Sequence, residues 1–593
     1  LVLSTATIAL QEQLLTKDID LVREITGWEI KPALAKGRLR YVCDRRLVEL
    51  VEGGSEDAPS LFEVPPTPAV KMTARALWKR RQIGSWDGDI DAWSETIPPA
   101  VHAAITVPGV ACSGPGCPQH ASCAVFAARQ GVRTAEIIVA NASLVMADIA
   151  SGGGLVLPKP GKCVYIFDEA HHLPEVARRQ FEVSVDVGRA RRSLRQIGMK
   201  LSMVTDAIDE IGVSLPEDLQ PRAMLLEQSY GEAEQRLLQE AVDEEAALVD
   251  ADSAWHLELM QETQFHGEWL DDVLSKLLDH AQQSRSDAGD AVVNEFGRVA
   301  ASVESLARLG RLWCYQPDPD PIARWVKADL KAGDVSLNAA PVDASSLLRK
   351  RLWSECGAAV LTSATLRSLG SFDMLKRDVG FRPDSRELAL ESPFDLKTQG
   401  RFEIHPDACS PRKIEQHTSA IVKALPDLLE GVRGALVLFA SYRQLEEVSQ
   451  RMPGTLAAQC LVQNTLPRHE LLEKHRESVR IGDRSVIMGV QSFGEGLDLP
   501  GEECEIVVIA KLPFVVPSDP VEVARSRWLE RRGRNPFLDD ALPRAHRTLV
   551  QWCGRLIRSE TDTGRIVIFD SRLGTERWGR QMLETLPPFA RGV

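Results

Sequence analysis

No apolar run of about 18 residues occurs in the sequence, so we expect no membrane-spanning helix. The first residues, LVLSTATIALQEQ, carry no basic segment ahead of their apolar stretch, and we therefore expect no signal peptide. Internal repeats and low-complexity tracts are absent as well. These absences argue against membrane, exported and repeat proteins and favour a globular protein of the cytoplasm.

An excess of positive charge is also missing. The chain has 70 Lys and Arg against 84 Asp and Glu, and the net charge of −14 argues against non-specific nucleic-acid binding by the whole surface. A local basic track remains compatible with this balance. The 11 cysteines come without an export signal, so we expect a reducing compartment in which thiols are ligands or core residues rather than disulfides.

Short apolar strands alternate with helical segments along much of the chain, as in KCVYIFDEA, ALVLFAS, SVIMGV and GRIVIFD. This alternation predicts an α/β fold with parallel sheets that helices cover on both faces. Residues 38 to 130 interrupt the pattern with Gly, Pro, Trp and Cys, and residues 186 to 345 are acidic and helix-rich with few strand signals. Proline-containing stretches near 316 to 321 and 393 to 412 are predicted linkers.

The segment VYIFDEAHH places two carboxylates directly after a predicted buried strand. Strands of an α/β sheet deliver such residues to the carboxyl edge, where ligands bind. There Asp168 could hold Mg²⁺ through its water shell, while Glu169 could orient and deprotonate an attacking water. The structural alternative is a helix start, where acidic residues interact favourably with the helix dipole.

Four cysteines fall within the irregular segment, in RYVCDRR and ACSGPGCPQHASC. Glycines and prolines between them make tight turns that would let the thiolates converge on one centre. Such a set binds Zn²⁺ or an iron–sulfur cluster, and the lone, distant first cysteine favours the cluster without excluding zinc. Unliganded core cysteines are the remaining alternative. The predicted ligands are Cys43, Cys112, Cys117 and Cys123.

Basic residues surround the first of these cysteines in KGRLRYVCDRR, and tryptophans alternate with basic residues in ALWKRRQIGSWDGDIDAW. Basic groups that follow phosphates and rings that stack on bases are the components of a single-strand channel. We predict that the tryptophans anchor the core of a small domain. DNA contact is predicted for Arg38, Arg40, Arg45 and Arg46.

Several segments, in order along the chain, resemble the motifs of superfamily-two helicases. DEAH at 168–171 resembles motif II, and LTSATLRSLGSF at 361–372 resembles motif III. QSFGEGLDLPG at 491–501 resembles motif V, and the segment at 551–573, which begins QWCGRLIRS, resembles motif VI. A four-cysteine insertion before motif II and a helical insertion after it are the plan of the XPD/DinG iron–sulfur helicases, and GRLRYVC, VANASLVMA and GRLIRS are most similar to the DinG-type branch.

The resemblance implies two recA-like parallel-sheet helicase lobes, with an iron–sulfur insertion and a helical arch insertion in the first lobe. The predicted boundaries are 1–37 for the first part of lobe 1, 38–130 for the iron–sulfur domain, 131–185 for lobe 1 with motif II, 186–345 for the arch, 346–398 for lobe 1 with motif III and a linker, and 399–593 for lobe 2.

The resemblance also implies an activity and its cofactors. We expect an ATP-dependent 5′-to-3′ DNA helicase whose ATPase is stimulated by single-stranded DNA and which acts in DNA repair and replication. ATP, Mg²⁺ and a [4Fe–4S] cluster would be its cofactors. Single-stranded DNA and forked or structured DNA would be its partners, and the enzyme would be a monomer associated with the bacterial nucleoid.

Residue roles follow motif by motif. The motif II and motif VI groups would face the phosphates from the two lobes, as a guanidinium supplied across a cleft neutralises charge that builds in transfer. The motif III hydroxyls would couple hydrolysis to strand movement. The implied residues are Asp168, Glu169, His171, Gln551, Arg555 and Arg558 for catalysis, Gly496 and Asp498 for nucleotide binding, and Ser363 and Thr365 for coupling. Trp552 departs from the small or aliphatic residue usual before the motif VI glycine.

A phosphate loop of the form G-x-x-x-x-G-K-S/T is missing from the printed sequence. PKPGKC at 158–163 does not replace it, because it precedes a strand and Val156 stands where the first glycine belongs. In the resembled family the loop lies just before motif Ia, where this sequence begins, so we expect it upstream of Leu1. The printed polypeptide alone would then bind ATP weakly, because the phosphate-binding amides and lysine are missing.

Two other functions remain open at this stage. One is a non-catalytic iron–sulfur protein that binds DNA junctions or senses redox state. The other is an enzyme that unwinds RNA or RNA–DNA hybrids.

Overall fold

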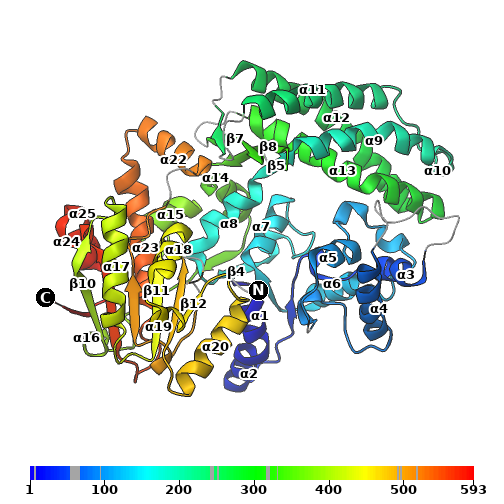
Figure 1. Ribbon diagram of the computed structural model, residues 1–593. Coiled ribbons are helices and arrows are strands. Elements are labelled where there is room, and N and C mark those ends of the chain that lie inside the picture. The colour runs from blue at the N-terminus through cyan, green and yellow to red at the C-terminus, as the bar shows by residue number, and fades with distance from the viewer. Residues whose placement is uncertain are drawn as a thin grey trace. The chain divides into compact units, whose positions relative to one another are not determined.

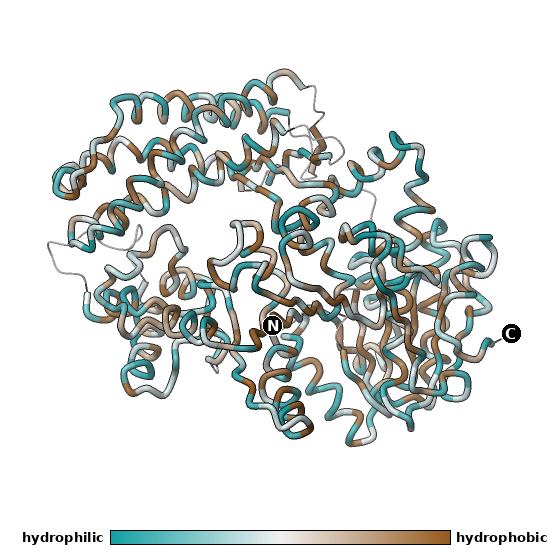
Figure 2. The backbone as a smooth tube through the Cα atoms, turned by 180° about the vertical axis from the view of Figure 1, so that it is seen from behind, coloured by the Kyte–Doolittle hydropathy of each residue, from teal (hydrophilic) through white to brown (hydrophobic). Residues whose placement is uncertain are grey.

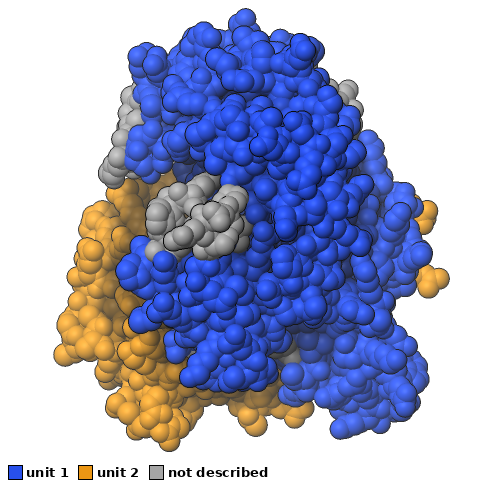
Figure 3. Space-filling model, turned by 90° about the vertical axis from the view of Figure 1, so that its right-hand side faces the viewer, with its two compact units in different colours: residues 1–362, 518–528 blue, residues 363–517, 529–593 orange. Residues whose placement is uncertain are grey.

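The computed structural model describes residues 1–5, 8–53, 67–93, 95–240, 246–249, 253–315, 321–329, 332–490, 493, 497–515 and 519–592. The chain divides into two compact units, residues 1–362 with 518–528 and residues 363–517 with 529–593 (Figure 3). Each unit contains a parallel sheet, which confirms the predicted α/β class. Within the described ranges, no helix is long and apolar enough to cross a bilayer.

The parallel sheet of the first unit has the order β2-β3-β1-β4-β9. Its strands come from three distant stretches of sequence, so the two insertions leave the sheet and return to it. β9 is an edge strand, and its Val360 is 51% exposed. The strands are β1 Val2–Thr5, β2 Pro32–Leu34, β3 Ile137–Asn141, β4 Val164–Phe167 and β9 Ala358–Leu361. The flanking helices are α1 Ile8–Gln13, α2 Ile19–Thr26, α7 Ala142–Ala150, α8 Leu173–Phe181 and α14 Ser345–Leu348.

The cysteine-bearing insertion is a small helical module with its own core (Figure 1). Trp86 is buried there, its ring 5.2 Å from that of Trp93, and Trp78 packs against the same cluster. The tryptophans therefore serve the core, as the sequence predicted. The helices are α3 Asp44–Glu52, α4 Pro68–Gln82, α5 Pro99–Ile105 and α6 Ala124–Thr134.

The second insertion is a bundle of long helices joined to an antiparallel sheet of order β5-β8-β7-β6 (Figure 1). The sequence had predicted few strands in this region, whereas the structure has this four-stranded sheet. In β8 the alternate residues Val335, Leu337 and Ala339 pack into the core formed by the helices. This alternation extends over only a few residues, so the longer helical patterns around it dominate the sequence signal. The helices are α9 Val187–Met203, α10 Thr205–Glu210, α11 Leu219–Glu240, α12 Ala254–Ser284 and α13 Asp287–Cys314. The strands are β5 Val183–Asp186, β6 Ala247–Leu248, β7 Ile322–Asp329 and β8 Asp334–Pro341.

The sheet of the second unit has the order β12-β13-β11-β14-β15-β10-β16, and every pairing is parallel. All residues of β11 and β13 are buried, as expected for central strands covered on both faces, and the sheet is predominantly hydrophobic in Figure 2. The strands are β10 Gly400–Cys409, β11 Gly434–Phe439, β12 Cys460–Val462, β13 Ser485–Val490, β14 Ile506–Ile509, β15 Gly564–Asp570 and β16 Ala590–Arg591. The helices are α15 Asp373–Val379, α16 Leu396–Gln399, α17 Ile414–Leu428, α18 Tyr442–Arg451, α19 Gly454–Ala457, α20 Arg468–Arg480, α23 Leu542–Cys553, α24 Arg572–Thr575 and α25 Arg577–Thr585, and α22 Pro520–Arg531 has most of its residues in the first unit.

The linker predicted at residues 393 to 412 is wrong for its central part, because β10 occupies residues 400–409. β10 pairs with β15 from Gly400 to Ile404, and the register then shifts before Cys409. Pro406 lies within that irregularity, where a missing backbone N–H does not interrupt the ladder. The proline therefore marks a bulge rather than a boundary between domains.

Candidate functional site

The two motif II carboxylates lie at the carboxyl edge of the first unit's sheet. They follow β4 directly, and the backbone N–H of Asp168 donates to Ser4 O of β1 at 2.8 Å. The N–H of Ala170 donates to Thr362 O, just after β9, at 3.1 Å. Because neighbouring strands hold the loop on both sides, the carboxylates have a defined position at the edge where α/β proteins bind ligands.

Glu169 has a left-handed backbone with φ of 47°, which is uncommon for a residue other than glycine and costs of order 1 kcal/mol. Its Oε2 lies 3.2 Å from Nδ1 of the buried His171, and its side chain is 38% exposed. The backbone strain and the histidine contact together orient one carboxylate towards solvent. This geometry suits a group that positions a water molecule.

Burial raises the pKa of Asp168 above its ordinary value, against a backbone hydrogen bond from Glu169 that lowers it, while the charge of Glu169 raises it further. A carboxylate whose charge is disfavoured in this way gains most from a nearby cation. Asp168 is therefore the residue of this edge best suited to hold Mg²⁺ through water.

The motif VI arginines converge on one backbone oxygen in the second unit. Arg555 Nη1 and Arg558 Nη2 donate to Leu497 O at 2.8 and 2.7 Å. Arg558 Nε also lies 3.7 Å from Asp498 Oδ1, so the structure brings together motif VI and the predicted Asp498. The other predicted nucleotide-binding residue of motif V, Gly496, lies outside the described residues.

A single carboxylate shapes the loop after these arginines. Asp562 accepts from the backbone N–H groups of Arg558, Ser559 and Gly501 at 2.7, 2.9 and 3.1 Å. Burial alone would raise the pKa of Asp562, but these bonds and one from the Ser559 hydroxyl hold the pKa below its ordinary value. Sequence reasoning did not identify Asp562, because its N–H donors lie three, four and 61 residues before it and form no short-range pattern.

The motif III hydroxyls lie against the motif VI helix. Ser363 Oγ and Thr365 Oγ1 are 3.2 Å apart, and Gln551 Nε2 of α23 donates to Thr365 Oγ1 at 3.3 Å. These residues belong to the second unit, which begins at residue 363, whereas the sequence boundaries assigned residues 346–398 to the first lobe. The contacts with α23 are the physical reason for this grouping.

The predicted metal ligands occupy neighbouring positions in the cysteine module. Cys43 and Cys123 occupy the N-cap positions of α3 and α6 without a capping hydrogen bond from their side chains, and the N–H of Gly114 approaches Cys112 Sγ at 3.4 Å. Helix N-termini and backbone N–H groups favour thiolates. Three of the cysteines, Cys43, Cys112 and Cys117, line a common cavity of about 40 Å³.

Burial and nearby positive charge shift the pKa values of the thiols at this cavity in opposite directions. Burial raises the pKa of Cys43 to about 11, and burial also raises the pKa of Cys117, although Arg45 lowers it. Arg45, Arg46 and the arch residues Asn294 and Arg298 line the same cavity. Sequence reasoning missed Asn294 and Arg298, because nothing in a helix far along the chain indicates which distant module it meets.

Across the described residues, no three His, Cys, Asp or Glu side chains are grouped so that they could hold one metal ion. A tetrahedral zinc site would need its sulfurs within about 4 Å of one another, given Zn–S bonds of about 2.3 Å. A four-iron cluster binds each thiolate to a different iron and so separates the sulfurs more widely.

The predicted DNA-contact arginines differ in their surroundings. Arg46 is buried and donates to Ala103 O and Ala104 O, and Arg45 pairs with Asp290 of α13 at 3.2 Å. These two residues hold the module together. Arg40 is half-exposed and pairs with Asp91 at 2.9 Å, whereas Arg38 is partly exposed.

Arg38 lies in a locally positive environment. Burial lowers the pKa of Arg129, and the nearby charges of Arg38 and Arg133 lower it further, although Asp148 opposes them. Guanidinium groups that repel one another in this way favour an anion between them. Among the predicted basic residues, the partly exposed Arg38 can therefore contact an anion, whereas Arg40 is already paired with Asp91.

The sequence PKPGKC does not form a phosphate loop. Pro160–Lys162 forms a short turn ahead of β4, and the preceding loop wraps the buried carboxylate of Asp148. That carboxylate accepts from the N–H groups of Gly154, Leu155 and Val156 at 2.9, 3.1 and 2.7 Å. Because these amides are already occupied by a carboxylate, they are not available to phosphate.

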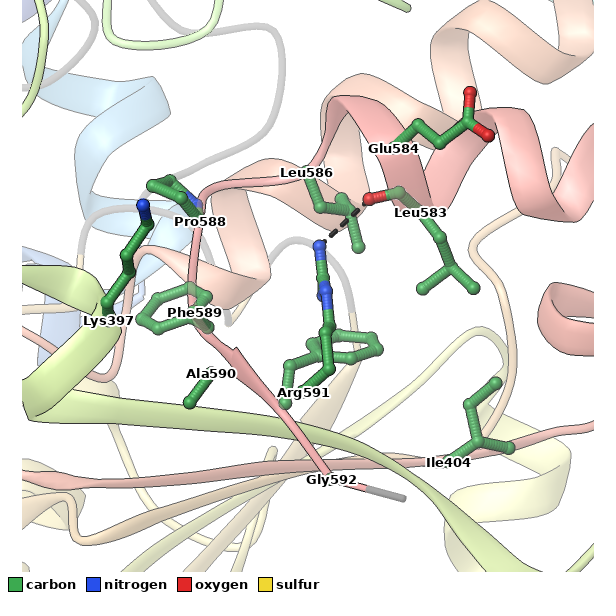
Figure 4. Close-up of a pocket in the computed structure, with 11 residues that line it drawn as sticks. Lys397, Ile404, Leu583, Glu584, Leu586, Pro588, Phe589, Ala590, Arg591 and Gly592 are labelled. Atoms are coloured by element: carbon green, nitrogen blue, oxygen red, sulfur yellow. Dashed lines mark hydrogen bonds between the residues drawn. The ribbon is translucent and has the colours of Figure 1, made fainter.

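A cavity of about 770 Å³ opens beside β10, β16 and the end of α25 (Figure 4). Arg591 donates to Leu583 O at 2.8 Å, and its guanidinium lies 5.1 Å from the centre of the Phe402 ring. The rest of the lining is largely apolar, and none of the predicted site residues contributes to it. The cavity therefore has no part in the arrangement described above.

Comparisons with known proteins agree with this arrangement. A family model described as a helicase C-terminal domain matches residues 427–589. The ATP-dependent DNA helicase DinG of Photobacterium profundum is 36% identical over 624 residues, which cover 100% of this chain and 88% of the relative. The ATP-dependent DNA helicase DinG of Escherichia coli (strain K12) is 31% identical over 628 residues, which cover 99% of this chain and 86% of the relative.

Among solved structures, an XPD helicase matches with a TM-score of 0.53 at 14% identity, covering 100% of this chain and 91% of the other. At that identity the likeness concerns the fold alone. It agrees with two recA-like units, each built on a parallel sheet.

Proposed function

Because the chain belongs to the DinG family of ATP-dependent DNA helicases, we propose that it unwinds DNA in the 5′-to-3′ direction and that single-stranded DNA stimulates its ATPase. Forked or structured DNA met during repair and replication would be its substrate, and it would act as a monomer at the nucleoid. The observation that carries the proposal is the pair Asp168 and Glu169 at the carboxyl end of β4, with Glu169 held in a left-handed conformation beside His171.

The motif II residues have distinct tasks in this proposal. As an ATP-dependent enzyme the protein uses ATP with Mg²⁺, and the ion neutralises charge on the phosphates. Asp168 would hold that ion through water, since its buried carboxylate gains from a cation. Glu169, partly exposed and fixed by strain, would orient the attacking water and accept its proton.

The motif VI arginines would supply positive charge from the second unit. Each uses one terminal nitrogen to hold Leu497 O, so its remaining N–H groups keep a defined direction. A guanidinium held in this way can stabilise charge on transferring phosphoryl oxygens without reorganising. Gln551 would join motif III to the same helix through Thr365.

We also propose that Cys43, Cys112, Cys117 and Cys123 hold a [4Fe–4S] cluster. Support comes from the caps of α3 and α6, the Gly114 N–H near Cys112 and the arginines around the cavity, all of which favour thiolates.

The test of the motor function uses protein expressed from its complete reading frame, with Mg²⁺, ATP and duplexes that carry a 5′ or a 3′ single-stranded tail. We expect ATP hydrolysis stimulated by single-stranded DNA and unwinding of the 5′-tailed duplex. Glu169→Gln should lower hydrolysis at least about 100-fold, whereas the control Glu175→Gln, on the exposed face of α8, should not.

Three results would contradict the proposal. Binding of DNA without any hydrolysis would leave a non-catalytic DNA-binding protein. Unwinding of only 3′-tailed duplexes would overturn the polarity, and stronger unwinding of RNA–DNA hybrids than of DNA would overturn the substrate.

The cluster is tested on anaerobically purified protein by iron and zinc analysis and by the visible absorbance of iron–sulfur clusters. We expect about four irons per chain and no stoichiometric zinc. Cys112→Ser should lose the iron, whereas Cys460→Ser in the second unit, where the thiol donates to Leu456 O, should retain it. One zinc per chain in the wild-type protein would refute the assignment.

A further inference from the structure

We propose that His546 is a positioning residue for coupling between ATP hydrolysis and strand movement: it fixes the turn at residues 368–371 to α23, so that Thr365 meets Gln551. The inference rests on the helicase function proposed above. All contacts of His546 itself lie within the second unit.

His546 is buried on α23 and has a partner for each ring nitrogen. Nδ1 accepts from the backbone N–H of Leu369 at 3.2 Å. Nε2 lies 2.9 Å from Thr585 Oγ1 of α25, whose hydroxyl also lies 3.0 and 3.1 Å from the carbonyl oxygens of Gln581 and Met582. The hydroxyl hydrogen therefore points to a carbonyl, its oxygen accepts from Nε2–H, and one neutral tautomer satisfies both contacts.

The turn that His546 holds is strained. Leu369 has φ of 49° and Gly370 has φ of 86°, while Ser368 and Ser371 exchange backbone hydrogen bonds of 2.8 and 3.0 Å. A leucine in the left-handed region costs of order 1 kcal/mol, and such a conformation persists only where its surroundings impose it. The Leu369 N–H bonded to His546 is one of the contacts that impose it, and the Ser368 hydroxyl bonded to Pro543 O of the same helix is another.

The pinned turn lies three residues beyond the coupling hydroxyl. Thr365 is buried and accepts from Gln551 near the end of α23, and the turn is tied to earlier residues of the same helix, Pro543 and His546. The motif III segment is thus attached to α23 at two places. α23 ends at Cys553, two residues before Arg555, so the motif III segment is attached to the helix that precedes the motif VI arginines.

The opposite end of the segment is tied to motif II. In the first unit, Thr362 O accepts from the N–H of Ala170, two residues after Asp168. Three peptide bonds separate Thr362 from Thr365, so the chain itself joins the motif II loop to the motif VI helix. His546 attaches the second half of this link to α23 through its bond with the Leu369 N–H.

A histidine that merely fills the core would make a different prediction. Its loss would lower thermal stability and leave the yield of strand separation per ATP unchanged. If His546 is a positioning residue, its loss lowers the yield of strand separation per ATP. A replacement side chain that again accepts from the Leu369 N–H should restore that yield. Asparagine is such a side chain, because its amide oxygen can occupy the place of Nδ1.

The experiment compares the wild-type protein with His546→Phe, His546→Asn and the control Thr585→Val, all expressed from the complete reading frame. His546→Phe keeps the ring volume and lacks both nitrogens. Thr585→Val removes the contact to Nε2 and the hydroxyl's own contacts within α25, and it leaves the bond between Nδ1 and Leu369 in place. We expect His546→Phe to lower the base pairs unwound per ATP by roughly tenfold, with DNA-free ATP hydrolysis and the KM for ATP within about twofold of wild type. His546→Asn and Thr585→Val should stay within about threefold of wild type.

A second measurement needs no variant. Hydrogen exchange of wild-type residues 366–371 should be as slow as that of α23, with and without nucleotide. The inference is overturned if this segment exchanges like an open loop, or if His546→Phe lowers the melting temperature without changing the yield per ATP. A wild-type protein that hydrolyses no ATP would instead refute the helicase proposal, and the exchange measurement would still decide the role of His546.

Discussion

Arg555 and Arg558 donate to the same backbone acceptor, the carbonyl oxygen of Leu497, at 2.8 and 2.7 Å. The two arginines lie three residues apart on the segment that follows α23. Their shared acceptor, the carbonyl of Leu497, lies more than fifty residues earlier in the sequence. A guanidinium can make this contact and still direct other N–H groups elsewhere, whereas an ammonium concentrates its donors on one atom.

Substitution by lysine should therefore remove function without removing charge. We expect Arg555→Lys and Arg558→Lys each to lower DNA-stimulated ATP hydrolysis about 1,000-fold, because an arginine aimed at transferring phosphate contributes on that scale. Steady-state hydrolysis rates and circular dichroism of the folded variants are the measurements. Arg565→Lys is the matched control, since Arg565 donates to Leu428 O at 2.8 Å in the same unit. Equal losses in all three variants would show a structural effect.

Buried histidines should make stability fall in mildly acidic solution. Burial lowers the pKa of His256 to about 4, from an ordinary value of 6.5. Between these two pH values the histidine takes up a proton in the unfolded chain but not in the folded chain. The free energy of unfolding therefore falls as the pH drops from 6.5 towards 4, and the full stability is present above pH 6.5. The histidine accounts for about 2 kcal/mol of that fall at pH 5.

Denaturant unfolding at pH 7.5 and pH 5 checks this prediction. His256→Phe keeps a ring beside Trp255 and Trp313 and should lose part of the pH dependence. The exposed His280, replaced by Gln, serves as the control and should leave the dependence unchanged. An identical pH dependence in wild type and His256→Phe would contradict the argument.

The cysteine module should be stabilised by its ion pair with the arch. Arg45 Nη1 lies 3.2 Å from Asp290 Oδ2, both side chains are largely buried, and Gln282 Nε2 of α12 donates to Cys112 O at 3.1 Å. We expect a double-mutant cycle of Arg45→Ala and Asp290→Ala to give a coupling energy of about 1 kcal/mol in thermal unfolding. The exposed pair Arg179 and Glu175, treated in the same way, should give less.

The same pair should affect retention of the metal. If Arg45 and Asp290 hold the module closed, iron release to a chelator should be faster in Asp290→Ala than in wild type. If Asp290→Ala releases iron at the wild-type rate while the double-mutant cycle still gives about 1 kcal/mol, the ion pair stabilises the module but does not protect the cluster.

Reversal of charge at Arg38 and Arg40 should weaken binding to single-stranded DNA. Each lost phosphate contact reduces the slope of the logarithm of the binding constant against the logarithm of salt by about 0.7 to 1. Fluorescence titrations of Arg38→Glu and Arg40→Glu at several salt concentrations measure that slope. Arg179→Glu, an exposed change on α8, is the control for general charge effects, and an equal change in its slope would refute a local track.

Arg46 should behave differently from these two. It is buried and donates to two carbonyl oxygens of α5, so Arg46→Ala should lower the melting temperature more than it changes the salt slope. The predicted basic cluster would then divide into residues that serve the fold and residues that serve DNA.

Local patterns were sufficient for a large part of this molecule. Asp168 and Glu169 come directly after an apolar strand, and a strand of an α/β sheet delivers the residues after it to the ligand-binding edge. The alternation of apolar strands with helices predicted the α/β class, and the ordered motifs predicted a helicase family that comparison with relatives supports.

Other features had no local signal. β10 contains a proline and was predicted as a linker, yet its pairing with β15 places the proline in a bulge. Arg298 lines the cysteine cavity from α13, a helix of the second insertion that lies far along the chain from Cys123. The tie between His546 and Leu369 joins residues 177 apart.

The sequence by itself determined the element types, the order of the motifs and the residues capable of acid–base, metal and phosphate chemistry, because hydrophobic period and residue type act over a few neighbours. Only the tertiary structure decided which of those residues already have partners within the protein, as Arg45 and Arg46 do. It also decided which carbonyl oxygen accepts from the motif VI arginines. Partners are chosen when folding brings distant segments into contact, and that choice depends on the packing of the whole unit rather than on any stretch of its sequence.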